Sequence, residues 1–141
     1  MKISLGIESE GLNGYTYVGV SKNLNQFCDD AQCTEIYSTD IINYIPYYEI
    51  EKYITHLVSK MRKGCKIILG GIDAMEACKM CLRQDFNILE YNKIIYGEDK
   101  KRPTCCHMTL SVLTKLLQSN GLKIMKKRLD GIQMIVEAIR E

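Results

Sequence analysis

The sequence has no long uninterrupted apolar run, and no segment approaches the roughly 20 consecutive apolar residues that a membrane-spanning helix needs. The first residues, Met1 to Gly6, also lack the long apolar stretch and the small-residue cleavage site of a secretory signal. We therefore expect a water-soluble protein of the cytoplasm that has no membrane partner.

An excess of charge of one sign is also missing, because 19 basic and 17 acidic residues leave a formal net charge of only +2. The two basic clusters, at 100–102 and 126–128, are short and have no interleaved aromatic residues, so we expect no nucleic-acid partner. The seven cysteines are an odd number in a chain long enough for an ample core. This argues against a disulfide framework and favours reduced thiols.

Proline is rare, with only Pro46 and Pro103, and no repeat, low-complexity tract or flexible linker interrupts the chain. A length of 141 residues is typical of one domain and is too short for two separate cores. We predict a single domain over residues 1–141.

Four β-prone runs precede the middle of the sequence. They cover residues 2–6, 15–20, 34–38 and 65–69. The last run is continuously apolar, which is typical of a central strand buried on both faces. Between the third and fourth runs, apolar residues recur at helical spacing from Ile50 to Met61, and we expect Gly64 to end this helix as its C-terminal cap. Strand, helix and strand in this order predict a right-handed βαβ unit.

Capping residues mark three helices in the second half. Asp73 followed by Glu76 has the spacing of a capping arrangement and predicts a helix start. A second, less regular helix is predicted over residues 88–95. Thr109 can cap a third helix whose leucines share one face, and Gly121 stands where the chain must leave it.

The end of the sequence has the pattern of a β-hairpin. The pair Asp130-Gly131 separates two β-prone runs, residues 122–129 and 132–139. Glycine accepts the positive φ that a type I′ turn requires, so this pair predicts such a turn. We therefore expect the sheet to finish antiparallel.

Three groups of segments match one known pattern in order and spacing. They are Ile3-Ser4-Leu5-Gly6 with Leu12-Asn13-Gly14-Tyr15, then Glu35-Ile36-Tyr37-Ser38 with Ile42-Asn43-Tyr44-Ile45-Pro46, and then Met61-Arg62-Lys63-Gly64-Cys65-Lys66-Ile67-Ile68. They resemble the glycine-rich turn, the fourth strand with its exit loop, and the turn before strand five of small class I S-adenosylmethionine (SAM)-dependent methyltransferases. The resemblance implies a reduced α/β, Rossmann-like three-layer sandwich with a mostly parallel sheet, SAM as cofactor and a small-molecule acceptor.

The pairing of the first two strands has two readings. The link from Gly6 to Tyr15 is short for a parallel crossover, so spacing alone favours a hairpin. The resemblance favours parallel pairing through a reduced connection, and we adopt the parallel arrangement.

The resemblance places a cofactor site at the carboxyl ends of the parallel strands. The residues that it implicates are Gly6, Ile7, Glu8, Gly19, Ser21, Asp30, Ser38, Thr39 and Asp40. Two usual contacts are missing, because Gly6-Ile7-Glu8 lacks the second glycine and Gly19 stands where an acid normally holds the ribose. Glu8 could replace the ribose contact, and Asp29 or Asp30 could replace an acid that contacts adenine.

Methyl transfer asks little of side chains beyond alignment of the reacting atoms and exclusion of water. A hydroxyl acceptor would need a base, for which Asp40, Asp73 and His107 are the candidates. Asp73 also fits a purely structural role as a helix cap. His107 also fits the role of a structural or surface histidine.

Two other hypotheses compete with an active enzyme. Cys78-Lys79-Met80-Cys81 and Cys105-Cys106-His107 contain enough ligands for zinc, although the first pair falls within a predicted helix. The stronger alternative is a catalytically inactive methyltransferase fold that acts as a binding or assembly module. A shortened fold would leave apolar sheet surface uncovered, so we also expect a homo-oligomer.

Overall fold

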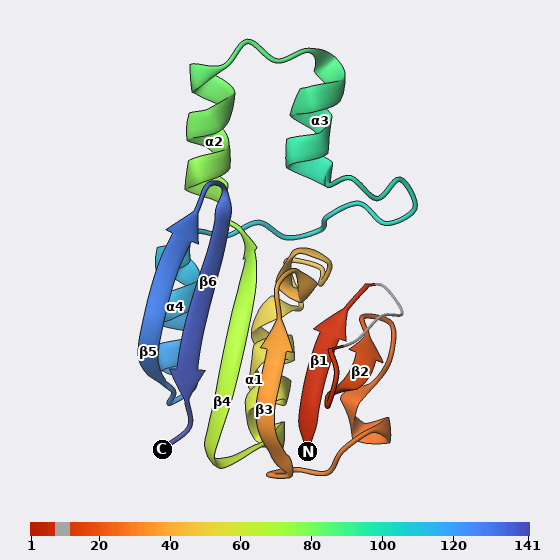
Figure 1. The fold of residues 1–141 in the computed structure, drawn as a ribbon, viewed down its shortest axis with the longest axis vertical. Coiled ribbons are helices and arrows are strands. Elements are labelled where there is room, and N and C mark those ends of the chain that lie inside the picture. Colours follow the sequence, from red (N-terminus) through yellow and green to blue (C-terminus); the bar gives the residue numbers. More distant parts are fainter. Residues whose placement is uncertain (8–11) are drawn as a thin grey trace.

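The computed structural model describes residues 1–7 and 12–141, which form one six-stranded sheet, four α-helices and two short 3-10 helices. The sheet order is β2-β1-β3-β4-β6-β5 (Figure 1). The strands are β1 (Lys2–Gly6), β2 (Thr16–Gly19), β3 (Cys33–Ser38), β4 (Met61–Ile72), β5 (Lys123–Asp130) and β6 (Gln133–Ile139).

Four neighbouring strands are parallel. β1 pairs in parallel with both β2 and β3, and β3 pairs in parallel with β4. The parallel pairing of the first two strands is therefore confirmed, despite the short link between them. β6 pairs antiparallel with both β4 and β5, which confirms the terminal hairpin.

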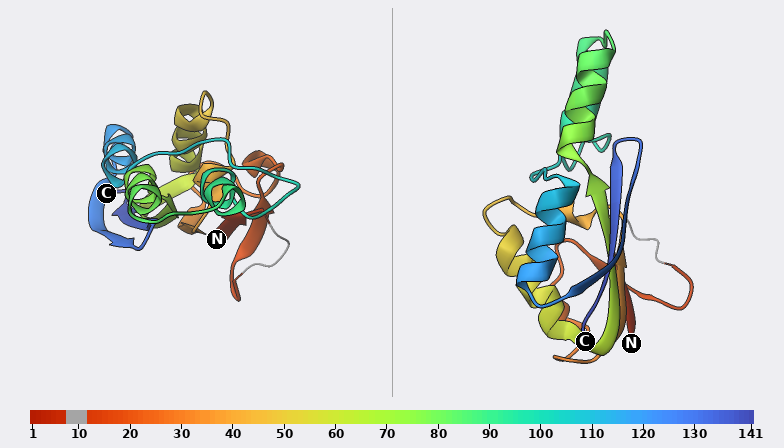
Figure 2. Two further views of the ribbon diagram at one scale, coloured as in Figure 1. Left: turned by 90° about the horizontal axis from the view of Figure 1, so that it is seen from above. Right: turned by 90° about the vertical axis from the view of Figure 1, so that its left-hand side faces the viewer.

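The helices occupy two places around the sheet. They are α1 (Ile50–Lys60), α2 (Ala74–Arg83), α3 (Ile88–Tyr96) and α4 (Leu110–Ser119), with 3-10 helices η1 (Leu24–Gln26) and η2 (Ile41–Asn43). Figure 2 shows α1 and α4 over the same face of the sheet, whereas α2 and α3 rise beyond its edge. That edge is the one at which β1, β3 and β4 end (Figure 1).

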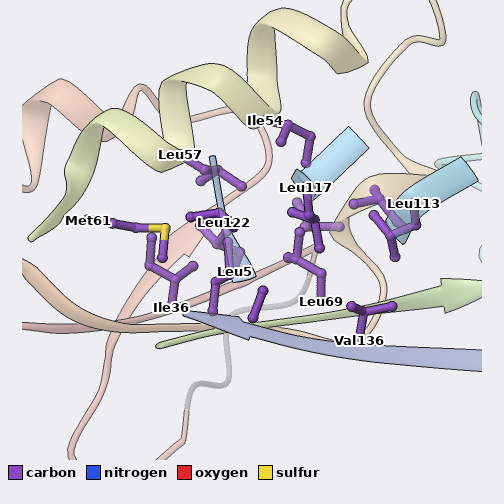
Figure 3. Close-up of a cluster of buried hydrophobic side chains, with 14 of the residues drawn as sticks. Leu5, Ile36, Ile54, Leu57, Met61, Leu69, Leu113, Leu117, Leu122 and Val136 are labelled. Atoms are coloured by element: carbon purple, nitrogen blue, oxygen red, sulfur yellow. The ribbon is translucent and has the colours of Figure 1, made fainter. Parts of the chain in front are cut away.

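The core lies between the sheet and the pair α1 and α4, as Figure 3 shows. Alternate residues of the strands face it, so Ile3, Ile36 and Ile67 are adjacent in register and fully buried. Leu57 of α1 and Leu117 of α4 are fully buried from the other side. The sequence pattern of alternating apolar residues therefore fixes which sheet face packs against helices.

The α/β, Rossmann-like architecture is confirmed, but only one of the two helical layers of a three-layer sandwich is present over the described sheet. On the second face, the residues alternate with the core positions and remain half-buried. They include Tyr17, Tyr37, Ile68 and Ile135. The missing layer follows from the short links before and after β2, which leave no room for a crossover helix.

Gly64 does not cap α1, so that prediction is wrong. The helix ends at Lys60, and Met61 is already extended. Gly64 lies inside β4 with φ +81, close to where the β3 and β4 pairing shifts register between Met61 and Lys66. Glycine tolerates positive φ without steric cost, and here it serves an irregular strand instead of a helix end.

The terminal hairpin turns one residue later than expected. Asp130 pairs with Gln133, so Gly131 and Ile132 form the two-residue loop. Of these two, only Gly131 has a positive φ, at +62. Positive φ at the first central position alone is the pattern of a type II′ turn, in place of the predicted type I′.

Both ends of the α2–α3 segment meet at one point of the sheet edge. Asp73 and Met108 form an isolated parallel bridge, and the Ala74 N–H donates to the Met108 carbonyl at 3.0 Å. The predicted cap at Asp73 is confirmed, since one of its carboxylate oxygens accepts the Glu76 N–H at 2.9 Å. Its other oxygen accepts the N–H of Leu110 in α4 at 2.7 Å.

Within residues 1–7 and 12–141, no helix is both long and apolar enough to cross a membrane.

Candidate functional site

A cavity of about 500 Å³ opens at the carboxyl ends of β1, β3 and β4. Ligand sites in proteins have volumes of about 300 to 1,000 Å³ and favour this edge of a parallel sheet. Its floor is lined by Ile7 after β1, by Thr39 and Asp40 after β3, and by Gly71 and Ile72 at the end of β4. The loops after three separate strands therefore converge on one space.

The exit of β3 is shaped by a side-chain turn. The hydroxyl of Ser38, which is fully buried, accepts the N–H of Ile41 at 3.0 Å and starts η2. This turn places Thr39 and Asp40 at the cavity. The Thr39 carbonyl also accepts a hydrogen bond from the Gln133 side chain at 3.2 Å, which ties the exit loop to β6.

Gly71 permits η2 to lie directly on β4. A Cβ atom at this position would come within 2.7 Å of Asn43 Oδ1 and 2.9 Å of Ile42 Cγ1. Real Cβ atoms do not approach heavy atoms this closely, so any side chain here would push η2 away from the strand. The cavity floor therefore depends on glycine at this position.

Asn43 joins three parts of the site. Its side-chain oxygen accepts the Ile72 N–H at 3.0 Å, and its side-chain nitrogen donates to the Cys106 carbonyl at 3.0 Å. Its backbone carbonyl accepts the Cys105 N–H at 2.7 Å. The amide thus holds η2, the end of β4 and the segment before α4 together, with all its bonds inside the protein.

The wall of the cavity opposite its floor comes from α3 and the loop after it. Lys93, Glu98, Asp99 and Thr104 line this side. Together with Asp40, the described part of the lining has three carboxylates and one ammonium group. The lining therefore favours a ligand with positive charge.

Several predicted cofactor residues come together here. Ile7, Thr39 and Asp40 line the cavity, and Gly6 lies beside Gly19 in the parallel register. A Cβ atom on Gly6 would lie 4.0 Å from Asp40 Oδ1. Ser38 lies below them as the buried support of the β3 exit.

Other predicted residues do not join this group. Ser21 is exposed beyond the end of β2 and lines none of the described cavities. Glu8 lies outside the described residues. Asp30 precedes β3 at the opposite end of the sheet, where its carboxylate accepts a hydrogen bond from the buried Lys60 ammonium at 2.7 Å. That bond holds the Asp30 pKa below its usual range.

The remaining candidates for a catalytic base lie outside the cavity lining. Both oxygens of Asp73 accept backbone N–H groups, which is the structural role of a helix cap. His107 lies on the other side of α3, where its Nε2 is 2.7 Å from the Ile95 carbonyl. Asp40 is the one base candidate among the three that reaches the cavity.

Sequence reasoning missed much of the α3 side of the cavity. Lys93, Glu98 and Asp99 read as ordinary surface charges, and no motif marks them. Asn43 and Tyr44 carried a signal, because they stand at positions where the resembled family has other polar residues. Their cavity position could therefore have been inferred.

The cysteines are all free thiols. Cys28 and Cys33 are buried with their sulfurs 3.6 Å apart, and burial together with this hydrogen bond raises the pKa of the Cys33 thiol to about 12. A thiol with such a pKa is a poor nucleophile at neutral pH. Among the described residues, no group of three histidine, cysteine or acidic side chains is arranged to hold a metal ion.

Comparisons with known proteins give a match at the level of structure. No model of a known protein family matches the sequence, and no curated sequence matches it either. A SAM-dependent methyltransferase from Mesorhizobium loti superimposes with a TM-score of 0.67 at 12% identity, over 99% of this chain and 90% of that one. One from Methanosarcina mazei gives 0.62 at 14% identity, over 99% and 82% of the two chains.

A third neighbour is a larger enzyme with a bound product of SAM. Magnesium protoporphyrin IX methyltransferase from Synechocystis, with bound S-adenosylhomocysteine, gives a TM-score of 0.58 at 18% identity. The match covers 92% of this chain but only 52% of that enzyme, so this chain spans about half its length. Sheet order, cavity position and these neighbours agree, and the chain has the fold of the class I SAM-dependent methyltransferases.

Proposed function

We propose that the cavity at the ends of β1, β3 and β4 binds SAM and that the protein transfers its methyl group to a small molecule. The observation that carries this proposal is the convergence of Ile7, Thr39, Asp40 and Gly71 on one cavity in this fold. In open α/β sheets, ligands bind where loops from neighbouring strand ends diverge. The structural neighbours with this fold are SAM-dependent methyltransferases.

The charges of the cavity suit the cofactor. SAM has a sulfonium and an ammonium group against one carboxylate, so its net charge is positive. Asp40, Glu98 and Asp99 offer it carboxylates, and Lys93 offers a partner for its carboxylate. The volume of about 500 Å³ is within the range of sites for ligands of this size.

The ribose contact is the weakest part of the fit. Gly19 ends β2 without a side chain, and Val20 and Ser21 follow it, so this strand end supplies no carboxylate. We assign the ribose hydroxyls to Asp40, because this carboxylate lies beside Gly6 where the β1 and β3 exits meet. When bound, SAM supplies a methyl group already activated by its sulfonium, so the protein chiefly aligns the acceptor and excludes water.

Calorimetric titration with SAM and S-adenosylhomocysteine tests this proposal. We expect both to bind, and we expect Asp40→Asn to weaken binding by about tenfold or more, as for a lost charge-assisted hydrogen bond. Asp30→Asn is the matched control, because it removes a carboxylate at the opposite end of β3 and should leave affinity unchanged.

Two results would contradict the proposal. The first is an absence of heat with either ligand at millimolar concentration from a protein whose thermal unfolding is normal. The second is a stronger effect of Asp30→Asn than of Asp40→Asn, since this would move the site to the other end of the sheet.

The uncovered sheet face favours the second candidate function, a binding or assembly module that pairs with its own copy. Across one row of this face, Glu35 lies between Lys2 and Lys66, with both ammonium groups 3.4 Å from its carboxylate. Glu137 and Lys126 are paired in the next row. Alternating charges and half-buried apolar residues make the face complementary to a second copy of itself.

Sedimentation at micromolar concentration tests this assembly. We expect a dimer, and we expect Tyr37→Asp at the centre of the face to shift it to monomer while leaving the helix-covered core intact. A monomer at all concentrations would exclude the assembly but would not affect the SAM proposal.

For the location of the protein, we propose the cytoplasm, which the seven free thiols support.

A further inference from the structure

Helices α2 and α3 form an unusual projection. Neither helix has a single buried residue, although both have apolar faces. At the tip, Leu82 is 87% exposed and Ile88 is 81% exposed. Most helices of a folded domain are held by burial of an apolar face, so this pair lacks the usual source of stability.

A cavity of about 620 Å³ lies between the two helices. It is larger than the cavity over the strand ends, and it is within the size range of small-molecule sites. Its lining consists of Ala74, Ala77, Cys78, Cys81, Leu82, Tyr91, Ile94, Ile95 and His107. The apolar faces of α2 and α3 are therefore turned toward this space.

The polar side chains of this lining are already engaged within the protein. The Tyr91 hydroxyl donates to the Cys81 carbonyl at 3.4 Å. Nε2 of His107 is 2.7 Å from the Ile95 carbonyl, and because a carbonyl oxygen only accepts, Nε2 must donate. Among the residues that the structure describes, this lining has no carboxylate, ammonium or guanidinium group. A charged ligand would thus lose its hydration without gaining a permanently charged partner.

The two cavities share a wall. Ile94 of α3 lines both of them. Thr104 lines the first cavity and lies 3.0 Å from the His107 ring, which lines the second. A molecule held between α2 and α3 would therefore lie next to a cofactor bound over the strand ends.

We propose that the cavity between α2 and α3 is the acceptor site and that the acceptor is an uncharged, largely apolar small molecule. The assignment as acceptor rests on the proposed binding of SAM in the neighbouring cavity. The chemistry of the occupant follows from the described lining alone, because this lining offers mainly apolar contact and no permanently charged side chain. Burial of the occupant also supplies the apolar contact that α2 and α3 lack in its absence.

A matched pair of fluorescent probes tests the occupant. N-phenyl-1-naphthylamine is uncharged, and 8-anilino-1-naphthalenesulfonate has the same rings with an added sulfonate. We expect the neutral probe to bind one site per chain, at least about tenfold more tightly than the sulfonate.

Two variants test whether the probe binds in the cavity between α2 and α3. Ala77→Phe adds a ring to the lining and should weaken the neutral probe by about tenfold or more. Met75→Phe adds a ring of the same size to α2 at an exposed position outside the lining, and should leave binding unchanged. Circular dichroism of both variants checks that α2 is still formed.

Three results would overturn the inference. They are equal affinity for the two probes, unchanged binding in Ala77→Phe with α2 intact, and probe affinity that falls as the protein dimerises, which would place a second copy in the cavity. Titration of the wild-type protein with S-adenosylhomocysteine separates the two proposals. If the wild type binds S-adenosylhomocysteine normally but does not bind the neutral probe, this inference alone is overturned. If it binds the probe but not S-adenosylhomocysteine, the SAM proposal is overturned, and with it the assignment of this cavity as the acceptor site.

Discussion

The sheet core and the α2–α3 projection differ in how much apolar surface they bury, and therefore in what stabilises them. Ile67 of β4 and Leu113 of α4 are fully buried, and their neighbours extend one continuous cluster across the sheet. Leu82 and Ile88 of the projection are almost fully exposed. The core is thus held by apolar burial, whereas the projection is held at its base.

This difference in burial implies a difference in local stability between the two regions. Isolated helices shorter than about 12 residues are marginal in water, and α2 and α3 have 10 and 9 residues. Their caps, from Asp73 and Asn87, and the bridge to Met108 keep them in place. The sheet core should therefore resist local unfolding more strongly than the α2–α3 projection does.

The largest difference between the regions is expected from truncation of equivalent side chains. Ile67→Ala should lower the free energy of unfolding by about 2 to 5 kcal/mol, because it leaves a cavity in the fully buried core. Ile88→Ala, at an 81% exposed position, should change it by less than about 0.5 kcal/mol. Urea denaturation of both variants measures the contrast, and similar losses in the two would show that the projection is packed like the core.

Removing the shared cap should affect both regions at once. Asp73→Ala leaves two partly buried backbone N–H groups, of Glu76 and Leu110, without their acceptor, at a cost of about 2 to 3 kcal/mol. Asn87→Ala removes only the cap of α3 and should cost about 1 kcal/mol of local helix stability with little effect on global unfolding. Global unfolding and native-state hydrogen exchange measure the two effects, and equal global losses would contradict this link between α2 and α4.

The floor of the strand-end cavity gives an intermediate effect. Gly71→Ala should cost about 1 to 3 kcal/mol, since the new Cβ would lie 2.7 Å from Asn43 Oδ1. Gly19→Ala is the control, because the nearest atom to its Cβ would be 3.8 Å away, and we expect less than about 0.5 kcal/mol. Thermal unfolding checks both, and a harmless Gly71→Ala would mean that η2 can move away from β4.

The smallest effect is expected from a salt bridge far from the projection. The hydrogen bond from Lys60 lowers the Asp30 pKa below its ordinary value of 3.8, so the bond stabilises the fold above that value and its contribution is lost as the pH falls through the folded-state pKa. Wild type should therefore exceed Asp30→Asn in stability near neutral pH, and the two should converge in acid. A difference that grows in acid would contradict this sign.

Local signals in the sequence predicted most of the framework. The caps at Asp73 and Thr109, the apolar spacing of α1 and the Asp130-Gly131 pair all depend on neighbouring residues, and each gave the right element. Gly64 led to a wrong prediction, that of a helix cap. A positive φ suits an irregularity in a strand as well as a helix end, and only the pairing of β4 with β3 decides between them.

The candidate site was predictable where it lies on strand ends and on the β3 exit with η2. Thr39 and Asp40 follow a recognisable strand, so their place at the sheet edge could be foreseen. Lys93 and Asp99 reach the cavity because α3 and the loop after it lie beyond this edge of the sheet, and no local pattern encodes that placement. The wide spacing of α2 and α3, which opens the second cavity, is likewise a tertiary property.

The bridge between Asp73 and Met108 has one more consequence, which concerns how this protein can be altered. A segment that departs and returns at adjoining points can be exchanged as a cassette without moving either flank. Everything between these two residues could be exchanged while the sheet keeps its shape. Because Lys93, Asp99 and Thr104 belong to this insert, an exchange would replace one wall of the strand-end cavity together with the cavity between α2 and α3.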